Sequence, residues 1–282
     1  MPQTPPVVLT IAGFDPSSGA GITADIKTIA AHGCYGVAAI TAMTIQSTAG
    51  VKRVSPVDPE LLSESLQDLA SDVSISAIHI GMLGSAMIAD RVADFLESYK
   101  CPHVVLDPVL TASSGASLLE KDGVAVLTER LLPLASVVTP NAAEAAALTQ
   151  TDVWSIDDMG LAAEKLHQMR ARAVVVTGGH LEKAADLLSP ESGKDMQIYK
   201  ANRFDSKCTH GTGCAFSTAI ACHLASGRSV AEAVLLAKAF VGAAIANGYA
   251  LGKGTAPVNH MYRMRNHPRT VSMTKNVASR GE

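Results

Sequence analysis

The sequence predicts an α/β fold with a central, mostly parallel sheet and helices on both faces of that sheet. Short apolar runs alternate with segments of helical spacing from residue 7 to residue 179, which is the order of repeated strand–helix–strand units. The runs are almost continuously apolar, as expected for strands that are covered on both faces. Most of them end in glycine or polar residues, which favours a ligand site beyond the carboxyl ends of the strands.

The first strand is predicted over residues 7–12, an apolar run between Pro6 and Gly13. The loop 13–21 contains three glycines but lacks the Gly-Lys-Ser/Thr end of a Walker loop and the spacing of a dinucleotide fingerprint. A helix with Ile22, Ile26 and Ile29 on one face follows this loop.

The middle of the chain repeats this pattern. Asp58 and Pro59 supply an N-cap and a first-turn proline, so a helix begins there. Asn141 is expected to cap a short helix that contains Glu144. Apolar runs predict strands over 36–44, 77–80, 104–106, 135–138 and 174–176, and helical spacing predicts helices over about 86–99 and 155–170.

The last third of the chain departs from the alternation. Residues 185–188 and 196–204 are predicted to form an edge hairpin, and two helices follow residue 211. We expect one domain over residues 1–268, because no linker rich in Gly, Ser or Pro divides it. The polar, Ser/Thr-rich residues 269–282 are expected to be a loose tail.

Composition limits the classes of function. The chain has 282 residues, 48% of them hydrophobic, and a net charge of −3, so neither a nucleic-acid surface nor a membrane-binding surface is expected. The apolar run 233–251 contains Lys238 and Asn247 and favours a buried helix over a membrane span. The five scattered cysteines favour reduced thiols in the cytoplasm, with no structural zinc.

A phosphate cradle is predicted at Gly211, Thr212 and Gly213, where a polar loop leads into a helix. Backbone N–H groups at a helix start are unpaired and carry partial positive charge. Glycines let an anion approach them closely. Cys214 lies in the first turn, where a depressed thiol pKa is expected, so it is our candidate general base. An ordinary glycine turn with a small buried cysteine explains this segment equally well.

Three side chains near strand ends suit a phosphoryl-transfer site. Asp107 and Glu144 each follow a strand, and carboxylates near phosphate usually hold magnesium. Gln46 offers a donor and an acceptor, which suits the edge of a pyrimidine. Surface carboxylates and polar loop residues are the simpler alternatives. His180 and His210 are read as loop histidines with satisfied hydrogen bonds.

Taken together, ten segments resemble the hydroxymethylpyrimidine/phosphomethylpyrimidine kinases of thiamine biosynthesis, which belong to the ribokinase-like superfamily. The match extends over about residues 7–262, nearly the whole chain. The segments are 9–21, 24–28, 41–47, 81–84, 105–109, 139–141, 144–145, 178–181, 209–214 and 257–260.

The resemblance implies a three-layer α/β/α ribokinase-like fold, usually in a homodimer. It implies transfer of phosphate from ATP to 4-amino-5-hydroxymethyl-2-methylpyrimidine, and then to the monophosphate. It also assigns roles to residues. The pyrimidine pocket would consist of Gln46, Gly13, Asp25, Met82 and Val109; the magnesium acids would be Asp107 and Glu144; the anion hole would be Gly211 to Gly213; and the base would be Cys214. We expect the nucleotide to be bound by Asn141, Thr177, Gly179 and Lys238.

One position departs from the family pattern. Thr177 stands where many of these kinases carry a lysine before Gly-Gly. Threonine supplies no positive charge, so the second phosphorylation is the step most affected. Two alternatives stay open: a pyridoxal kinase of the same superfamily, and a pyrimidine-binding protein without catalytic activity.

Overall fold

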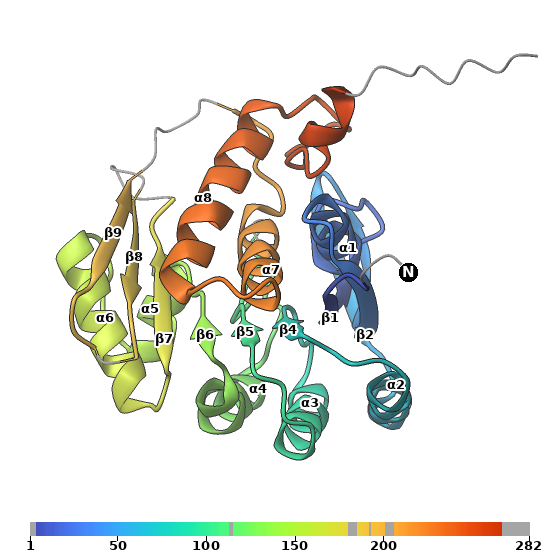
Figure 1. Ribbon diagram of the computed structural model, residues 1–282, viewed down its shortest axis with the longest axis horizontal. Helices are drawn as coiled ribbons and strands as arrows, with labels where there is room; N and C mark the ends of the chain where they lie inside the picture. The colour runs from blue at the N-terminus through green and yellow to red at the C-terminus, as the bar shows by residue number, and fades with distance from the viewer. Residues whose placement is uncertain (1–3, 113–114, 180–184, 192, 201–205, 267–282) are drawn as a thin grey trace, which may run out of the picture.

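The computed structural model describes residues 4–112, 115–179, 185–191, 193–200 and 206–266 (Figure 1). All strands of these residues belong to one sheet, in the order β3-β2-β1-β4-β5-β6-β7-β8-β9. The strands are β1 (Val7–Phe14), β2 (Tyr35–Ser47), β3 (Gly50–Pro56), β4 (Ala77–Ile80), β5 (Val104–Leu106), β6 (Val137–Val138), β7 (Ala173–Thr177), β8 (Ala185–Ser189) and β9 (Gln197–Lys200).

The helices cover both faces of this sheet. They are α1 (Gly21–Ala31), α2 (Pro59–Asp72), α3 (Ala86–Ser98), α4 (Lys121–Val126), η1 (Leu127–Leu131), η2 (Leu132–Leu134), α5 (Ala142–Thr149), α6 (Ile156–Gln168), α7 (Thr212–Ala225), α8 (Val230–Ala246) and η3 (Tyr262–Asn266). Helices α1, α7 and α8 lie on one face and α2 to α6 on the other (Figure 1). The predicted three-layer α/β/α arrangement is therefore confirmed.

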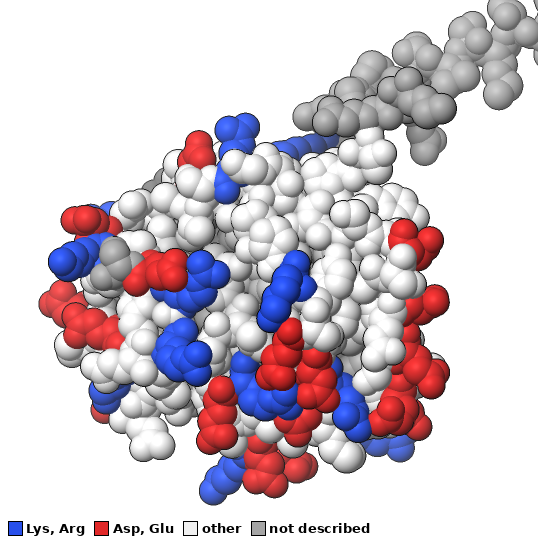
Figure 2. Space-filling model, turned by 60° about the horizontal axis from the view of Figure 1, so that its bottom comes forward, with Lys and Arg blue, Asp and Glu red and all other residues white. Residues whose placement is uncertain are grey.

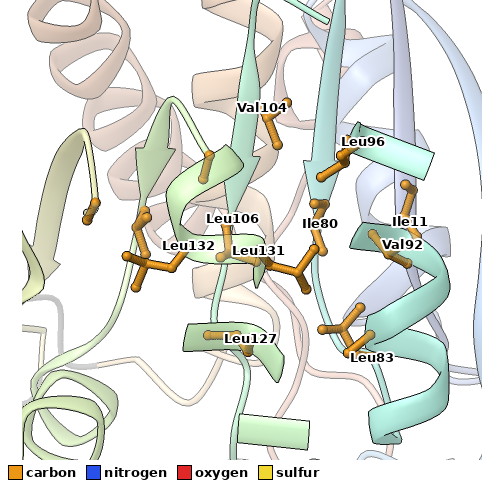
Figure 3. Packing of buried hydrophobic residues seen from close by; sticks show 14 of the residues in the cluster. Ile11, Ile80, Leu83, Val92, Leu96, Val104, Leu106, Leu127, Leu131 and Leu132 are labelled. Carbon is orange, nitrogen blue, oxygen red and sulfur yellow. The ribbon is translucent and has the colours of Figure 1, made fainter. Parts of the chain in front are cut away.

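Each face has its own hydrophobic core, because alternate strand residues point to opposite sides. Val8, Val105 and Val175 pack toward α7 and α8, where Phe240 is fully buried. The opposite core is larger and joins the strands to α2–α6 (Figure 3). Figure 3 labels ten of its members: Ile11, Ile80, Leu83, Val92, Leu96, Val104, Leu106, Leu127, Leu131 and Leu132.

The chain order creates a switch point beside β1. From β1 the chain passes through α1 to β2 on one side, and it later returns to β4 on the other side of β1. Strands β2, β1, β4, β5, β6 and β7 run parallel, so their carboxyl ends meet at one edge. Ligands of open α/β sheets bind where the strand order reverses in this way.

Two irregularities occur at that edge. The register of β1 with β2 shifts between Ala12 and Phe14, at Gly13. The register of β2 with β3 shifts between Ile45 and Gln46. Such bulges redirect side chains and are over-represented next to active sites.

The sequence missed some elements. Strand β3 and the helical segment from α4 to η2 were not predicted, and β2 continues to Ser47, beyond the predicted end at residue 44. Strand β9 covers only Gln197–Lys200 of the predicted 196–204, whereas residues 201–205 lie outside the described residues. The same holds for the predicted tail, 269–282.

The surface carries both signs of charge. On the face in Figure 2 basic side chains stand among acidic ones. Arg130 of η1 pairs with Asp90, Asp94 and Glu97 of α3, at N–O distances of 2.8–2.9 Å. Among the described residues, no helix is both long and apolar enough to cross a membrane.

Candidate active site

The residues predicted to form the site gather at the carboxyl edge of the sheet. Gly13 lies against Met82, because a Cβ added at Gly13 would overlap the Met82 side chain. Val109 follows Asp107, and its N–H donates to the Asp107 carbonyl (2.8 Å). A Cβ added at Gly213 would lie 3.7 Å from Asp107 Oδ2. The start of α7 and the end of β5 are therefore in contact.

The amino terminus of α7 lacks a side-chain cap. Gly211 precedes the helix with φ of 78°, and no side chain of the described residues accepts a hydrogen bond from the first turn. In contrast, Asn141, Ser155 and Ser229 close capping boxes on α5, α6 and α8. The Thr212 N–H donates to the Thr209 carbonyl (3.3 Å), so within the described residues the N–H groups of Gly213 and Cys214 are the ones available to an anion, as the cradle prediction requires.

Asp15 ties the loop after β1 to the segment before α7. Its Oδ2 accepts from His210 Nε2 (2.9 Å) and from the N–H groups of Gly19 and Ala20, and its Oδ1 accepts from Ser17. Burial opposes ionisation of Asp15, yet the hydrogen bonds from His210 and Ser17 lower its pKa below the usual value. Asp15 is therefore a carboxylate that only accepts hydrogen bonds.

Glycines make this contact possible. A Cβ at Gly19 would overlap the His210 ring, and a Cβ at Gly211 would overlap the Gly19 carbonyl. The His210 backbone is held as well, since its N–H donates to Ala256 O (3.1 Å) and its carbonyl accepts from Val258 (3.2 Å).

Gln46 lies on β2, next to this histidine. Its Nε2 is 3.4 Å from His210 Nε2, and its Oε1 is 3.2 Å from Thr44 Oγ1. Thr44 Oγ1 also lies 2.9 Å from the Phe14 carbonyl oxygen. Gln46 is half-buried and stands at the strand irregularity described above.

Asp107 and Glu144 form a buried acidic pair, with 6% and 7% of each residue exposed. Burial raises the pKa of both groups, and the charge of Asp107 raises that of Glu144 further. Glu144 Oε2 also accepts from the Asn141 N–H (2.9 Å). Two such carboxylates suit Mg²⁺, which binds one or two protein carboxylates together with phosphate oxygens. In the described residues no group of three or more His, Cys, Asp or Glu could hold a metal by itself.

Asp25 was expected in the pocket wall, but it lies beneath the site and is fully buried. It accepts from Thr10 Oγ1 (2.7 Å) and Thr218 Oγ1 (2.9 Å), and it lies 3.4 Å from His79 Nδ1. Burial by itself would lower the pKa of His79, but the Asp25 carboxylate raises it. Because Asp25 already has these partners, it supports the site from below in this structure.

The His79 ring continues this network toward Asp107. Its Nε2 lies 2.9 Å from Ser217 Oγ, and Ser217 Oγ lies 3.2 Å from Asp107 Oδ2. All these groups are buried. His79 and Ser217 carried no signal in the sequence, since His79 stands inside an apolar strand and Ser217 inside an apolar helix.

The expected depression of the Cys214 pKa is wrong. Loss of water around the thiol raises its pKa well above the usual value, and the charges of Asp25, Asp107 and Glu144 raise it further. The Gly21 N–H acts in the opposite direction. The helix terminus was visible in the sequence, but the three carboxylates that gather around it were not.

The proposed nucleotide residues lie at the ends of β6 and β7. Thr177 bridges to Asn141, and its N–H donates to Pro140 O (2.9 Å). Lys238 Nζ lies 2.6 Å from Asp186 Oδ2, and Asp186 Oδ1 accepts from the Gly178 N–H (3.2 Å). The charge of Lys238 is therefore already paired beside the Thr177–Gly179 turn. Gly179 is exposed, and His180 lies outside the described residues.

Comparison with known proteins identifies the family. The profile of a family described as phosphomethylpyrimidine kinase matches residues 15–259. The chain belongs to this family. The hydroxymethylpyrimidine/phosphomethylpyrimidine kinase of Haemophilus influenzae is 41% identical over 260 residues, covering 90% of this chain and 96% of the relative. A thiamine biosynthesis bifunctional protein of Geobacter sulfurreducens is 42% identical over 254 residues, and the match covers 52% of that longer protein.

Solved structures of the family and of pyridoxal kinases share the fold. The Bacillus subtilis pyridoxal kinase in complex with ADP has a TM-score of 0.86 at 34% identity, over 93% of this chain and all of that one. The Staphylococcus aureus pyridoxal kinase in complex with AMP-PCP and pyridoxal has a TM-score of 0.84 at 34% identity, over 93% and 96%. The phosphomethylpyrimidine kinase of Clostridium difficile has a TM-score of 0.76 at 36% identity, over 85% and 99%.

The acidic pair leads to a testable pH dependence. Glu144 loses its proton near pH 4.5 in the unfolded chain but near pH 8 in the folded protein. Folding therefore becomes less favourable as the pH rises through that window, and a glutamine at this position removes the effect. Glu144→Gln should gain stability over the wild type as the pH rises from 5 to 9, by at most about 5 kcal/mol, since the shift of the pKa from 4.5 to about 8 is 3.5 units at about 1.4 kcal/mol each.

Thermal unfolding without metal from pH 5 to pH 9 measures this difference. The exposed Glu129→Gln is the matched control and should show no pH-dependent gain. Added Mg²⁺ should stabilise the wild type more than Glu144→Gln. Equal stability of wild type and Glu144→Gln at pH 9 would show that the buried pair carries no electrostatic strain.

Proposed function

We propose that this protein transfers the γ-phosphoryl group of ATP to the hydroxymethyl group of 4-amino-5-hydroxymethyl-2-methylpyrimidine, and then phosphorylates the monophosphate. The observation that supports this most is the uncapped start of α7 beside the buried acids Asp107 and Glu144, at the switch point of the sheet. An anion cradle next to a cation site is what phosphoryl transfer requires. The choice of a pyrimidine as the substrate rests on the family membership.

The site residues divide into three groups on this proposal. Gln46 pairs with the pyrimidine edge, and Gly13, Met82 and Val109 form the wall around the ring. Asn141, Thr177, Gly179 and Lys238 lie toward the nucleotide. Asp107 and Glu144 would hold Mg²⁺, which screens the triphosphate and offsets the carboxylate charge around Cys214.

In the reaction the hydroxymethyl oxygen forms a bond to the γ-phosphorus while the bond from that phosphorus to the β–γ bridging oxygen breaks. The hydroxyl proton must leave. We assign Cys214, whose thiol lies in the first turn of α7, as the base that takes this proton. Burial raises the thiol pKa, and the negative charges of Asp25, Asp107 and Glu144 raise it further. Neutralising that charge lowers the thiol pKa, so the thiolate forms more readily.

Cys214→Ala tests this role. Removing a positioned base typically lowers the rate by about 10²–10⁴-fold, so kcat should fall by that range while pyrimidine affinity changes little. Coupled ADP release gives kcat, and calorimetry gives the affinity. A variant that retains the wild-type kcat would remove Cys214 from proton transfer.

A second candidate is a pyridoxal kinase, favoured by the similarity to the two solved pyridoxal kinases. The same ADP-release assay separates the alternatives when the pyrimidine alcohol, its monophosphate, pyridoxal and ribose are offered separately. Turnover of pyridoxal alone would support the second candidate. ADP release with none of the four would favour a binding protein without catalytic activity.

Thr177 should limit the second phosphorylation. Its acceptor already carries a phosphate with a charge of roughly −1.5 to −2, and Lys238 next to this turn is paired with Asp186. Thr177→Lys adds a positive charge, so it should raise kcat/KM for the monophosphate more than for the alcohol. Thr177→Gln, similar in length but uncharged, is the control. An equal effect of both variants on the two substrates would contradict this role.

We also propose that the enzyme is a homodimer in the cytoplasm. Apolar side chains are exposed along the edge ribbon, namely Tyr35, Ile40, Met43 and Ile45 of β2 and Leu61 of α2. Ile40, Met43 and Leu61 line a hollow of about 290 Å³. Apolar surface of this kind favours a partner, for which we propose a second copy of the chain. All five cysteines are free thiols, in keeping with a reducing compartment. The mass in solution, for the wild type and for Ile45→Lys, tests the dimer.

A further inference from the structure

The orientation of the Gln46 amide can be deduced from the groups that surround it. A glutamine amide has an acceptor oxygen and a donor nitrogen of similar size, so its orientation follows from its hydrogen-bond partners. One end of the Gln46 amide faces His210 and the other end faces Thr44. Each of these two contacts indicates the orientation of the amide independently of the other.

The His210 contact requires an acceptor. Asp15 is a carboxylate and lies 2.9 Å from His210 Nε2, so that nitrogen carries a proton and donates it to Asp15. The amide atom that lies 3.4 Å from the same Nε2 therefore faces an N–H group. A nitrogen at this position would place one donor against another, whereas an oxygen accepts part of the same N–H bond.

The Thr44 contact requires a donor. A threonine hydroxyl has one proton, and the Phe14 carbonyl, 2.9 Å away, can only accept it. Thr44 Oγ1 then offers lone pairs to the amide atom 3.2 Å away. That atom must be the nitrogen. Both contacts demand the same orientation, with the amide oxygen toward His210 and the amide nitrogen toward Thr44.

We propose that His210 holds the Gln46 amide in this orientation and thereby selects the way round in which the pyrimidine binds. The proposal rests on the pyrimidine kinase function given above. His210 is a positioning residue here, because it acts through Gln46. It is suited to that role, since Asp15, the backbone of Ala256 and Val258, and the close approach of Gly19 fix its ring and main chain.

The orientation has a chemical consequence. Gln46 Oε1 retains a lone pair and Nε2 retains a proton, so together they match a ring that offers an amino donor beside a nitrogen acceptor. The 4-amino group then pairs with Oε1 on the His210 side, and N3 pairs with Nε2 on the Thr44 side. Because C5 is next to C4, the hydroxymethyl group also lies on the His210 side. Gly211, Thr212 and Gly213 follow His210 directly, so the reacting oxygen is directed to the cradle.

The matched experiment compares the 4-amino alcohol with its 4-oxo analogue, which has an acceptor at position 4 and a donor at N3. The locked amide opposes both groups of the analogue, so the wild type should reject it. His210→Phe keeps a ring of similar size but removes the donor, so the amide can turn and accept the analogue. We expect the ratio of kcat/KM for the amino over the oxo substrate to fall by about 10- to 100-fold.

Thr44→Val provides a second variant with intact His210. It removes the other contact that fixes the amide, and the same ratio should fall. His167→Phe is the control, because that histidine of α6 bonds Ser189 of β8 and the Ala171 carbonyl, away from Gln46. It should leave the ratio unchanged.

The outcomes separate this proposal from the proposed function. If His210→Phe and Thr44→Val reduce kcat/KM for both substrates equally, the two residues are only structural and the orientation proposal is overturned. If the ratio falls in both variants and not in His167→Phe, it is supported. A wild type that phosphorylates neither pyrimidine would refute the proposed function itself. In that case, calorimetric binding of the two pyrimidines would still test the orientation.

Discussion

Three buried carboxylates, Asp25, Asp107 and Glu144, surround the start of one helix, and the chemistry of the site depends on their mutual repulsion. Burial leaves them little water to spread their charge. Asp25 has His79 and two threonines as partners, while Asp107 has only Ser217 among the hydrogen bonds described. Glu144 keeps its proton more strongly than a free carboxyl group. Repulsion between these carboxylates favours the binding of a cation at the site.

Burial and the same negative charge both act on Cys214. In most proteins a cysteine in the first turn of a helix is acidified by the helix dipole. Here burial of the thiol, together with the nearby carboxylates, raises the pKa of Cys214 well above its usual value, against the effect of the dipole. Proton removal is therefore linked to neutralisation of the acids, because the pKa of Cys214 depends on the charge of what is bound beside it.

Local sequence patterns account for most of the fold, because buried parallel strands and amphipathic helices carry clear periodicities. Strand β3 escaped prediction because its exposed residues have a polar, unpatterned composition, as expected for an edge strand. In the site, Asp107, Glu144 and the glycines of the cradle were predicted because each follows a strand or starts a helix. Asp15 and His210 were not recognised as partners, since they are 195 positions apart in the chain and only the fold brings them together. The direction of the Cys214 pKa shift was wrong for the same reason.

The helix that completes this site is also among the last parts of the chain to be made. Until α7 leaves the ribosome, the faces of β1, β4, β5 and β7 that carry Val8, Ala77, Val105 and Val175 have no cover over much of their area. The loop after β1 meanwhile lacks the histidine that anchors it. During synthesis the first two hundred residues therefore expose a broad apolar surface, of the kind that chaperones bind. The core on the α7 and α8 face and the anchor of the loop after β1 are therefore completed only after the larger core of α2–α6 has been made.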